Sequence, residues 1–157
     1  MVDTAATMSR FGRTLIAAAG GLLVLATTAV VSATPGTGVS SAVLGKGTSP
    51  GGIVVSSPEK ADVAVLEITI VPGGSTGWHY HDGHLIAVVK SGTLTRTLHD
   101  CSTEVTPRGG SFVEPAGRNQ THIGRNLGTE PVVLLVTYVL PAGQPLSQDA
   151  PAPPCGL

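Results

Sequence analysis

Three histidines lie close together within residues 73–92, in the sequence GGSTGWHYHDGHLIAVVKSG. His79 and His81 are two residues apart, a spacing that puts both side chains on the same face of a β-strand. His84 follows the turn signal Asp82-Gly83, so its ring could reach back toward the same point. Clustered imidazoles bind zinc, copper, iron, nickel or manganese, and geometry decides among these metals. The spacing therefore indicates a metal site, with unrelated surface histidines beside a tight turn as the alternative.

A second stretch, GGSFVEPAGRNQTHIGRN at residues 109–126, adds another histidine. His122 follows the turn signal Pro115-Ala116-Gly117 and lies four residues before Asn126. Glu114, directly before that turn, is a weaker candidate ligand, because a carboxylate beside a turn is more often solvated than buried.

Together, the two stretches resemble the two motifs of the cupin superfamily. The first motif, G-x5-H-x-H-x3–4-E-x6-G, is matched at Gly73, His79, His81 and Gly92. The second motif, G-x5-P-x-G-x2-H-x3-N, is matched at positions 109, 115, 117, 122 and 126, with two extra residues before the histidine. The resemblance covers about residues 63–141 and implies a metal held by the motif histidines.

The sequence departs from the first motif at its glutamate, whose position is taken by Leu85. Leucine cannot bind a metal, and His84, one residue earlier, is the natural substitute. This predicts a four-histidine site made of His79, His81, His84 and His122. Without His84, three histidines remain, and three protein ligands with open positions still make a metal site. The bound ion would be Zn, Mn, Fe, Ni or Cu, and no catalytic residue is identified.

Strand signals surround both histidine stretches, in a chain with 21 glycines and 12 prolines and no sustained helical period after residue 33. Strands are predicted at residues 63–71, 76–81, 85–90, 93–98, 103–106, 111–114, 121–125 and 132–140, with a short one at 53–56. Short strands separated by turns predict an all-β sandwich or barrel. With the cupin resemblance, this becomes a jelly-roll β-barrel, or double-stranded β-helix, with the site inside its mouth.

The N-terminal region reads as a secretory signal peptide, which would form a signal helix. Arg10 and Arg13 precede an apolar run at residues 15–31, and the small residues of Val31-Ser32-Ala33 predict cleavage after Ala33. The alternative is a single membrane anchor, although the run is at the short limit for spanning. The expected organisation is a signal peptide (1–33), a flexible leader (34–52), a cupin barrel (53–141) and a Pro-rich tail (142–157), in a secreted protein.

Cys101 and Cys155 are the only two cysteines. In an exported chain, a single pair indicates one disulfide rather than two free thiols. Such a bridge would pin the Pro-rich tail, which has little core of its own.

A formal net charge of −1 gives no electrostatic reason to expect nucleic acid or an anionic membrane as a partner. The expected partner is a small-molecule ligand or substrate, with a membrane involved only if the signal segment is retained. Cupins often form dimers, so a homodimer stays open. Because fold does not fix function, three hypotheses remain: a metal-dependent oxygenase or isomerase, a non-catalytic binding module, and a structural barrel that has lost its metal.

Overall fold

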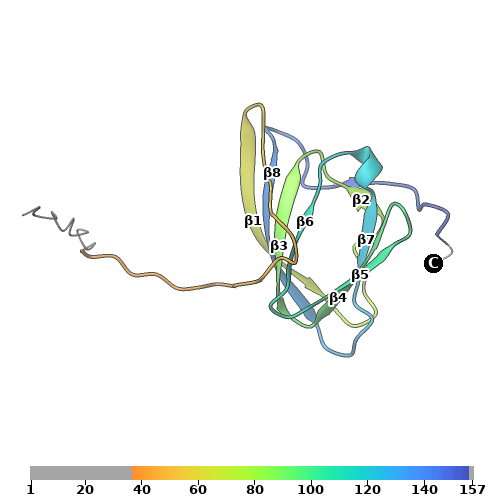
Figure 1. Ribbon diagram of the computed structural model, residues 1–157, viewed down its shortest axis with the longest axis horizontal. Helices are drawn as coiled ribbons and strands as arrows, with labels where there is room; N and C mark the ends of the chain where they lie inside the picture. Colours follow the sequence, from red (N-terminus) through yellow and green to blue (C-terminus); the bar gives the residue numbers. More distant parts are fainter. Residues whose placement is uncertain (1–36, 156–157) are drawn as a thin grey trace, which may run out of the picture. The chain divides into compact units, whose positions relative to one another are not determined.

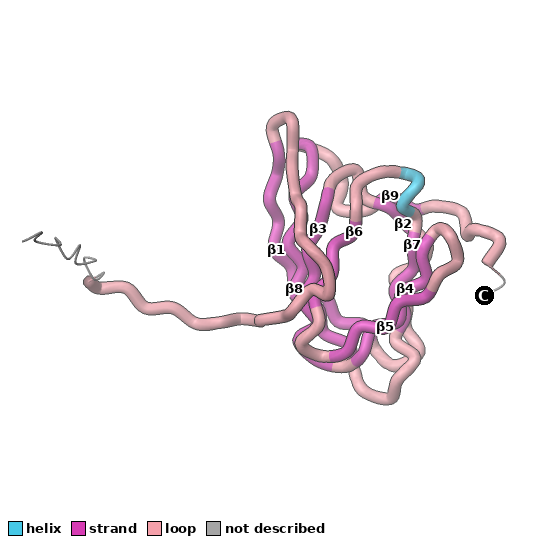
Figure 2. The backbone as a smooth tube through the Cα atoms, viewed as in Figure 1, coloured by secondary structure: helices cyan, strands magenta, loops and turns pink. Residues whose placement is uncertain are grey.

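Two antiparallel β-sheets face each other in this protein (Figure 1, Figure 2). The structure is a computed structural model that describes residues 37–155, and both sheets belong to the unit Ser40–Leu157. The predicted signal peptide, its helix and the cleavage site after Ala33 lie outside the described residues. Within the described range, no helix is long and apolar enough to cross a membrane.

The first sheet contains four strands in the order β1-β8-β3-β6. These strands are β1 (Ala61–Ile70), β8 (Val132–Pro141), β3 (His84–Ser91) and β6 (Ser111–Glu114). Buried and partly exposed residues alternate along β8 and most of β3, because successive side chains of a strand point to opposite faces. The inward face supplies most of the core: Leu85, Ala87, Val89, Phe112, Val132, Leu134, Val136, Tyr138 and Leu140.

The second sheet contains five strands in the order β5-β4-β7-β2-β9. These strands are β5 (Thr103–Pro107), β4 (Thr93–Leu98), β7 (His122–Arg125), β2 (His79–Tyr80) and β9 (Gln148–Asp149). A short 3₁₀ helix, η1 (Arg118–Gln120), precedes β7. The all-β prediction is confirmed, and the strands expected at residues 93–98 and 111–114 have those bounds.

The structure differs from the predicted strands in two places. Residues 53–56 form no strand, and the strand expected at 76–81 is reduced to the two residues of β2. The Pro-rich tail, expected to be irregular, contains β9, which pairs His79 with Asp149 and Tyr80 with Gln148. A short strand such as β2 leaves backbone groups that need partners, and β9 supplies them from a distant part of the chain.

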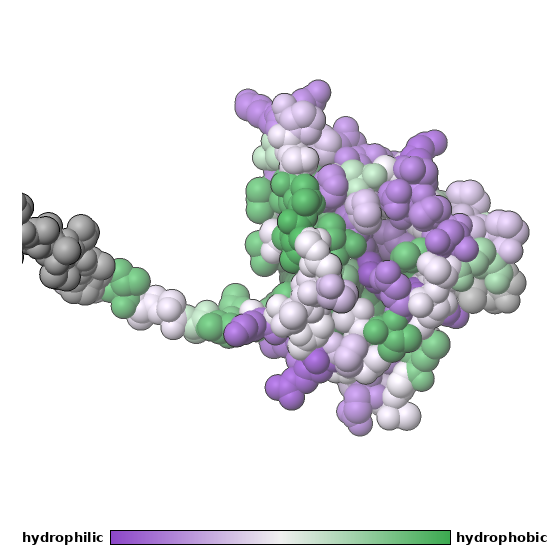
Figure 3. All heavy atoms as spheres, in the orientation of Figure 1, coloured by the Kyte–Doolittle hydropathy of each residue, from purple (hydrophilic) through white to green (hydrophobic). Residues whose placement is uncertain are grey.

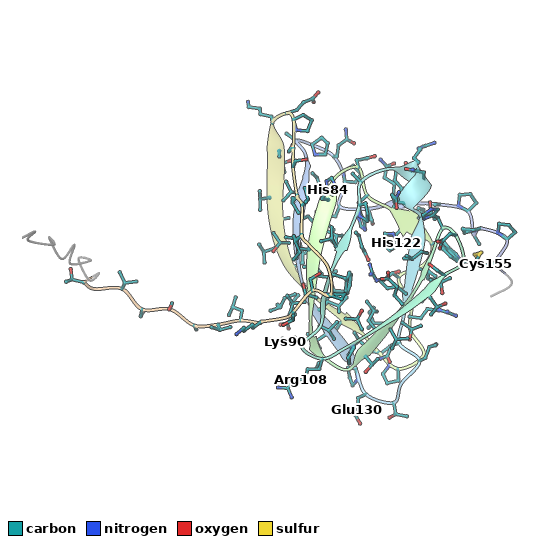
Figure 4. The ribbon with its side chains drawn as sticks, viewed as in Figure 1. His84, Lys90, Arg108, His122, Glu130 and Cys155 are labelled. Carbon is teal, nitrogen blue, oxygen red and sulfur yellow. A yellow bond between two sulfur atoms is a disulfide. The ribbon has the colours of Figure 1, made fainter. Side chains whose placement is uncertain are left out.

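A disulfide joins Cys101 to Cys155, with their Cα atoms 5.2 Å apart (Figure 4). Cys101 has a φ of 65°, a left-handed conformation that is uncommon for residues other than glycine. The Asp100 carboxylate supports this turn by accepting a 2.9 Å hydrogen bond from the Ser102 N–H. Residues 142–155 run from the end of β8 to this bridge, and we call this segment the C-terminal strap.

Apolar side chains are exposed on β1, the outermost strand of the first sheet. Val63 and Val65 are 66% and 67% exposed, and Figure 3 shows apolar residues gathered on this side of the molecule. Glu67 interrupts the row and pairs with Lys90 of β3 at 2.6 Å. A single chain does not test whether the protein forms a homodimer, and this question stays open.

Candidate metal centre

Four side chains converge between the two sheets: His79, His81, Glu114 and His122. One ligand atom from each lies within 4.8 Å of all the others. His79 is the first residue of β2, and His81 is the residue directly after that strand. His122 is the first residue of β7 and the cross-strand partner of His79. Glu114 is the last residue of β6, on the opposite sheet. His81, His122 and Glu114 are buried, at 1%, 3% and 8% exposed, whereas His79 is partly buried.

The second ring nitrogen of each histidine is held by the backbone. The Nδ1 atoms of His79, His81 and His122 lie 2.9, 2.6 and 2.7 Å from the carbonyl oxygens of Gly77, Leu146 and Gln120, respectively. A carbonyl oxygen only accepts, so each Nδ1 carries a hydrogen and donates it. The three Nε2 atoms are left to face the cluster, which is the usual arrangement around a histidine that ligates a metal.

Glu114 makes this arrangement unfavourable without a positive charge in the cluster. Its Oε2 lies 3.1 Å from His81 Nε2 and 2.9 Å from His122 Nε2. In the neutral tautomer set by the backbone, each of these nitrogens presents a lone pair to a carboxylate oxygen. His122 Nε2 is also buried without a hydrogen bond among the described residues. Three imidazole nitrogens and one carboxylate oxygen fit a divalent transition metal, which would replace this repulsion by coordination.

The electrostatics of the cluster couple Glu114 to its neighbours. Burial alone would raise the pKa of Glu114, but His122, His81 and Arg96 together lower this pKa well below its usual value. Burial acts to lower the pKa of His122, yet the adjacent Glu114 outweighs it and raises the pKa. Burial lowers the pKa of His79, which therefore stays neutral. Without a metal, the proton that compensates Glu114 belongs on His122.

Arg96 fixes the orientation of the Glu114 carboxylate from β4. Its Nη1 donates to Glu114 Oε1 at 3.2 Å, so the other oxygen, Oε2, is turned toward the histidines. The Arg96 guanidinium lies over the Phe112 ring, 3.6 Å from the ring centre, and its Nη2 forms an ion pair with Glu104. Hydrogen bonds of this kind to a ligating carboxylate commonly support metal affinity.

His84, the predicted fourth ligand, is not part of the four-residue cluster. It is the first residue of β3, and Leu85 beside it is buried and lines the interior, so the His84 side chain faces the other side of the sheet. In Figure 4, His84 and His122 lie on different strands. Glu114 thus lies in the cluster where His84 was expected, and the set of metal ligands stays a prediction.

The carboxylate comes from the strand next to the one where the family motif carries it. Leu85, at the motif's glutamate position, is the direct cross-strand partner of Glu114. Glu114 is buried rather than solvated, which reverses our sequence interpretation of it. The signal was present in β6, where Phe112 and Glu114 are two residues apart and so share the inward face.

Two cavities flank the cluster. The apolar cavity, about 40 Å³, is lined by His79 and His81 together with mainly apolar residues such as Leu85, Leu94, Phe112 and Tyr138. The polar cavity, about 160 Å³, is lined by Arg96, His99, Glu104, Gln120 and His122, with Leu98, Val113 and Pro115. Glu114 lines both cavities. A ligand in either space would lie against the cluster.

Residues 66–138 match the family model described as "Cupin domain". The chain carries a cupin domain. This match includes all four residues of the cluster. It also includes the three strands of the two sheets that carry or adjoin these residues, β2, β6 and β7. No curated protein matches the chain.

Solved structures are similar to this cupin domain in fold. The polyketide cyclase RemF from Streptomyces resistomycificus is 20% identical, with a TM-score of 0.50 over 62% of this chain and 66% of that one. The SPY1581 protein of unknown function from Streptococcus pyogenes is 24% identical, with a TM-score of 0.46 over 54% of this chain and 70% of that one. A Klebsiella pneumoniae protein with a double-stranded beta-helix domain is 22% identical, with a TM-score of 0.48 over 61% and 78% of the two chains. At these identities the likeness concerns the fold alone.

Proposed function

We propose that this protein holds one divalent transition-metal ion on His79, His81, Glu114 and His122 and binds or acts on a small molecule beside it. The observation that carries this proposal is that Nδ1 of each of the three imidazoles lies against a backbone carbonyl, which leaves Nε2 facing the cluster. A cation or an extra proton would satisfy Nε2 atoms that face a carboxylate. When bound, such an ion would supply Lewis-acid or O₂-activating chemistry.

Residues of the cupin domain itself would position and protect the small molecule. The cavity beside His79 and His81 has mainly apolar walls, and an apolar surrounding strengthens electrostatic interactions. Tyr138 lines this cavity, and burial followed by the charge of Glu114 raises its pKa to about 12. Its hydroxyl therefore keeps its proton near neutral pH and can donate a hydrogen bond to a ligand.

The metal content of the purified protein tests this proposal. We expect about one equivalent of a transition metal by elemental analysis, and loss of that metal in the Glu114→Gln and His122→Ala variants. His99→Ala is the matched control, because His99 lies outside the four-residue cluster. Retention of metal by both cluster variants would contradict the assignment of these ligands.

A structural barrel without metal is the second candidate. It is favoured by the ion pairs that already compensate Glu114, namely those with Arg96 and with a protonated His122. Protein that takes up no zinc, manganese, iron, nickel or copper after reconstitution would establish this alternative and overturn the metal proposal.

We also propose that the protein is exported and cleaved after Ala33. The basic residues Arg10 and Arg13, the apolar run and the small residues at 31–33 support this proposal, and a disulfide suits an oxidising compartment. N-terminal sequencing of protein recovered from the medium should begin at Thr34. Recovery of the uncleaved chain in the membrane fraction would contradict cleavage.

A further inference from the structure

Arg96 is a buried cation with two carboxylate partners of very different exposure. The Arg96 side chain is only 4% exposed, and the Glu114 side chain only 11%. Glu104, its other partner, is 50% exposed and belongs to β5, which pairs only with β4 and so forms an edge of its sheet. A half-exposed carboxylate can rotate toward the solvent at a small cost in free energy, because exposed ion pairs contribute little net free energy. Glu104 is therefore the replaceable partner of Arg96.

The space beside Arg96 suits a carboxylate that arrives from solution. The polar cavity, about 160 Å³, has room for several water molecules and hence for a ligand of a few non-hydrogen atoms. Arg96 Nε is buried and has no partner among the described residues. A guanidinium offers paired N–H groups that match the two oxygens of a carboxylate.

The charges around the polar cavity favour an anion. A divalent ion on the cluster and Arg96 would bring three positive charges, whereas Glu104 and Glu114 bring two negative charges. Once Glu104 turns toward solvent, the loaded site would carry two uncompensated positive charges, and one bound carboxylate would reduce them to one. These charges include the proposed metal ion. The exchange of partners on Arg96 does not require that ion.

We propose that the polar cavity is the binding site of a small carboxylate anion, which pairs with Arg96 in place of Glu104. Glu104 acts as an internal substitute for the ligand and keeps Nη2 of the buried guanidinium paired when the ligand is absent, while Nη1 stays paired with Glu114. Because an unpaired buried group is costly, the exchange leaves both sides of the Arg96 guanidinium paired. The ligand then lies beside Glu114 and His122, against the metal centre.

Acetate is the probe for this proposal, and acetamide is its uncharged counterpart of similar shape. The Nε–H signal of Arg96 in ¹⁵N-correlated NMR spectra reports directly on the guanidinium. We expect acetate, but not acetamide, to shift this signal in a saturable manner. Glu104→Gln should tighten acetate binding about tenfold, because it removes the internal competitor.

Glu67→Gln is the matched control, since Glu67 is also about half exposed, at 51%, and paired with a cation, Lys90. It removes the same charge far from Arg96 and should leave acetate affinity unchanged. Folded Arg96→Gln protein should no longer bind acetate. Unchanged or weaker acetate binding by Glu104→Gln, or an equal response to acetamide, would overturn the proposal.

Titrations of metal-free and zinc-loaded protein, with zinc content measured in the same samples, separate this inference from the proposed function. Zinc binding without saturable acetate binding overturns the anion site alone. Failure to bind zinc or the other candidate metals overturns the proposed function, and the metal-free titration then decides the anion site.

Discussion

At the scale of single residues, the position of one carboxylate distinguishes this site from the family motif. Glu114 on β6 lies directly opposite Leu85 on β3, and side chains of such cross-strand pairs point to the same side of the sheet. A carboxylate moved from one strand to the facing position on its neighbour therefore still reaches the same cluster. Leu85 in turn lines the apolar cavity.

Substitutions can test whether Glu114, rather than His84, is the fourth metal ligand. Glu114→Gln removes the one anionic candidate ligand, so we expect metal affinity to fall by about 100-fold or more, beyond the loss typical of supporting residues. His84→Ala should leave affinity and stoichiometry unchanged, because His84 lies outside the cluster. Competition with a metal-binding dye measures both variants. A large loss in His84→Ala would restore the four-histidine site.

The pH dependence of metal binding follows from His122. Although burial works in the opposite direction, Glu114 raises the pKa of His122 above its ordinary value of 6.5, so a proton competes with the metal already above this pH. His79, whose pKa is lowered by burial, contributes less to this competition. Metal affinity should therefore decline as the pH falls from 8 toward 6, as followed by dye competition at each pH. A flat profile through this range would contradict the coupling of Glu114 and His122.

At the scale of structural elements, the C-terminal strap is part of the site. The Leu146 carbonyl in the strap accepts the Nδ1–H of His81, and β9 pairs with the histidine strand β2. The bridge between Cys101 and Cys155 closes the strap against the loop after β4. The disulfide thus holds the element that orients a candidate ligand.

Removing the disulfide should weaken metal binding. In Cys155→Ser the strap loses its distal anchor, and we expect about a tenfold loss of zinc affinity, in the range found when a supporting hydrogen bond of a ligating histidine is lost. Leu146→Ala is the control, because it keeps the backbone carbonyl that His81 uses. Calorimetric titration with zinc measures both. Equal affinity of Cys155→Ser and the unaltered protein would show that the strap holds its place without the bridge.

Gly83, in the turn between β2 and β3, has no room for a side chain. A Cβ atom there would lie 2.1 Å from the Val139 carbonyl oxygen and 2.7 Å from Leu140 Cα, both on β8. Gly83→Ala should lower the free energy of unfolding by about 2 kcal/mol, as overpacking typically does. Gly51→Ala is the control, since nothing lies within 4 Å of its Cβ position. Urea denaturation compares the two, and equal midpoints would show that the turn can shift.

At the scale of the whole molecule, the disulfide joins parts of the fold that are distant in sequence, and a metal on the cluster would do the same. The cluster joins β2 and β7 of one sheet to β6 of the other. The bridge encloses a sequence separation of 54 residues, worth roughly 4 kcal/mol in the chain-entropy description. Both links act on a domain too small to have a large core.

Bound metal should therefore raise the melting temperature. At a free zinc concentration one hundred times the dissociation constant, the folded state gains about 2.7 kcal/mol, which corresponds to a rise of about 10 °C for a domain near 100 residues. Differential scanning calorimetry with zinc and with a chelator measures the difference. Glu114→Gln should show almost no rise at the same zinc concentration, and an equal rise in this variant would indicate binding elsewhere.

The sequence by itself determined the features that depend on local periodicity. Short apolar and β-branched runs between turn signals marked the strands, and the two-residue spacing of His79 and His81 placed both on one face. Turn signals around His122 placed a third histidine at the start of a strand. These features were predictable because a strand's side-chain direction has a period of two, whatever lies beside the strand.

Only the tertiary structure decided which carboxylate completes the cluster and what holds His81. The choice of Glu114 over His84 depends on the register between β3 and β6, which aligns Leu85 with Glu114. The carbonyl that orients His81 comes from Leu146, 65 residues away, through a strap that no local pattern predicts as a strand. Register and long-range closure arise from packing of the whole chain, so residue spacing within one motif cannot specify them.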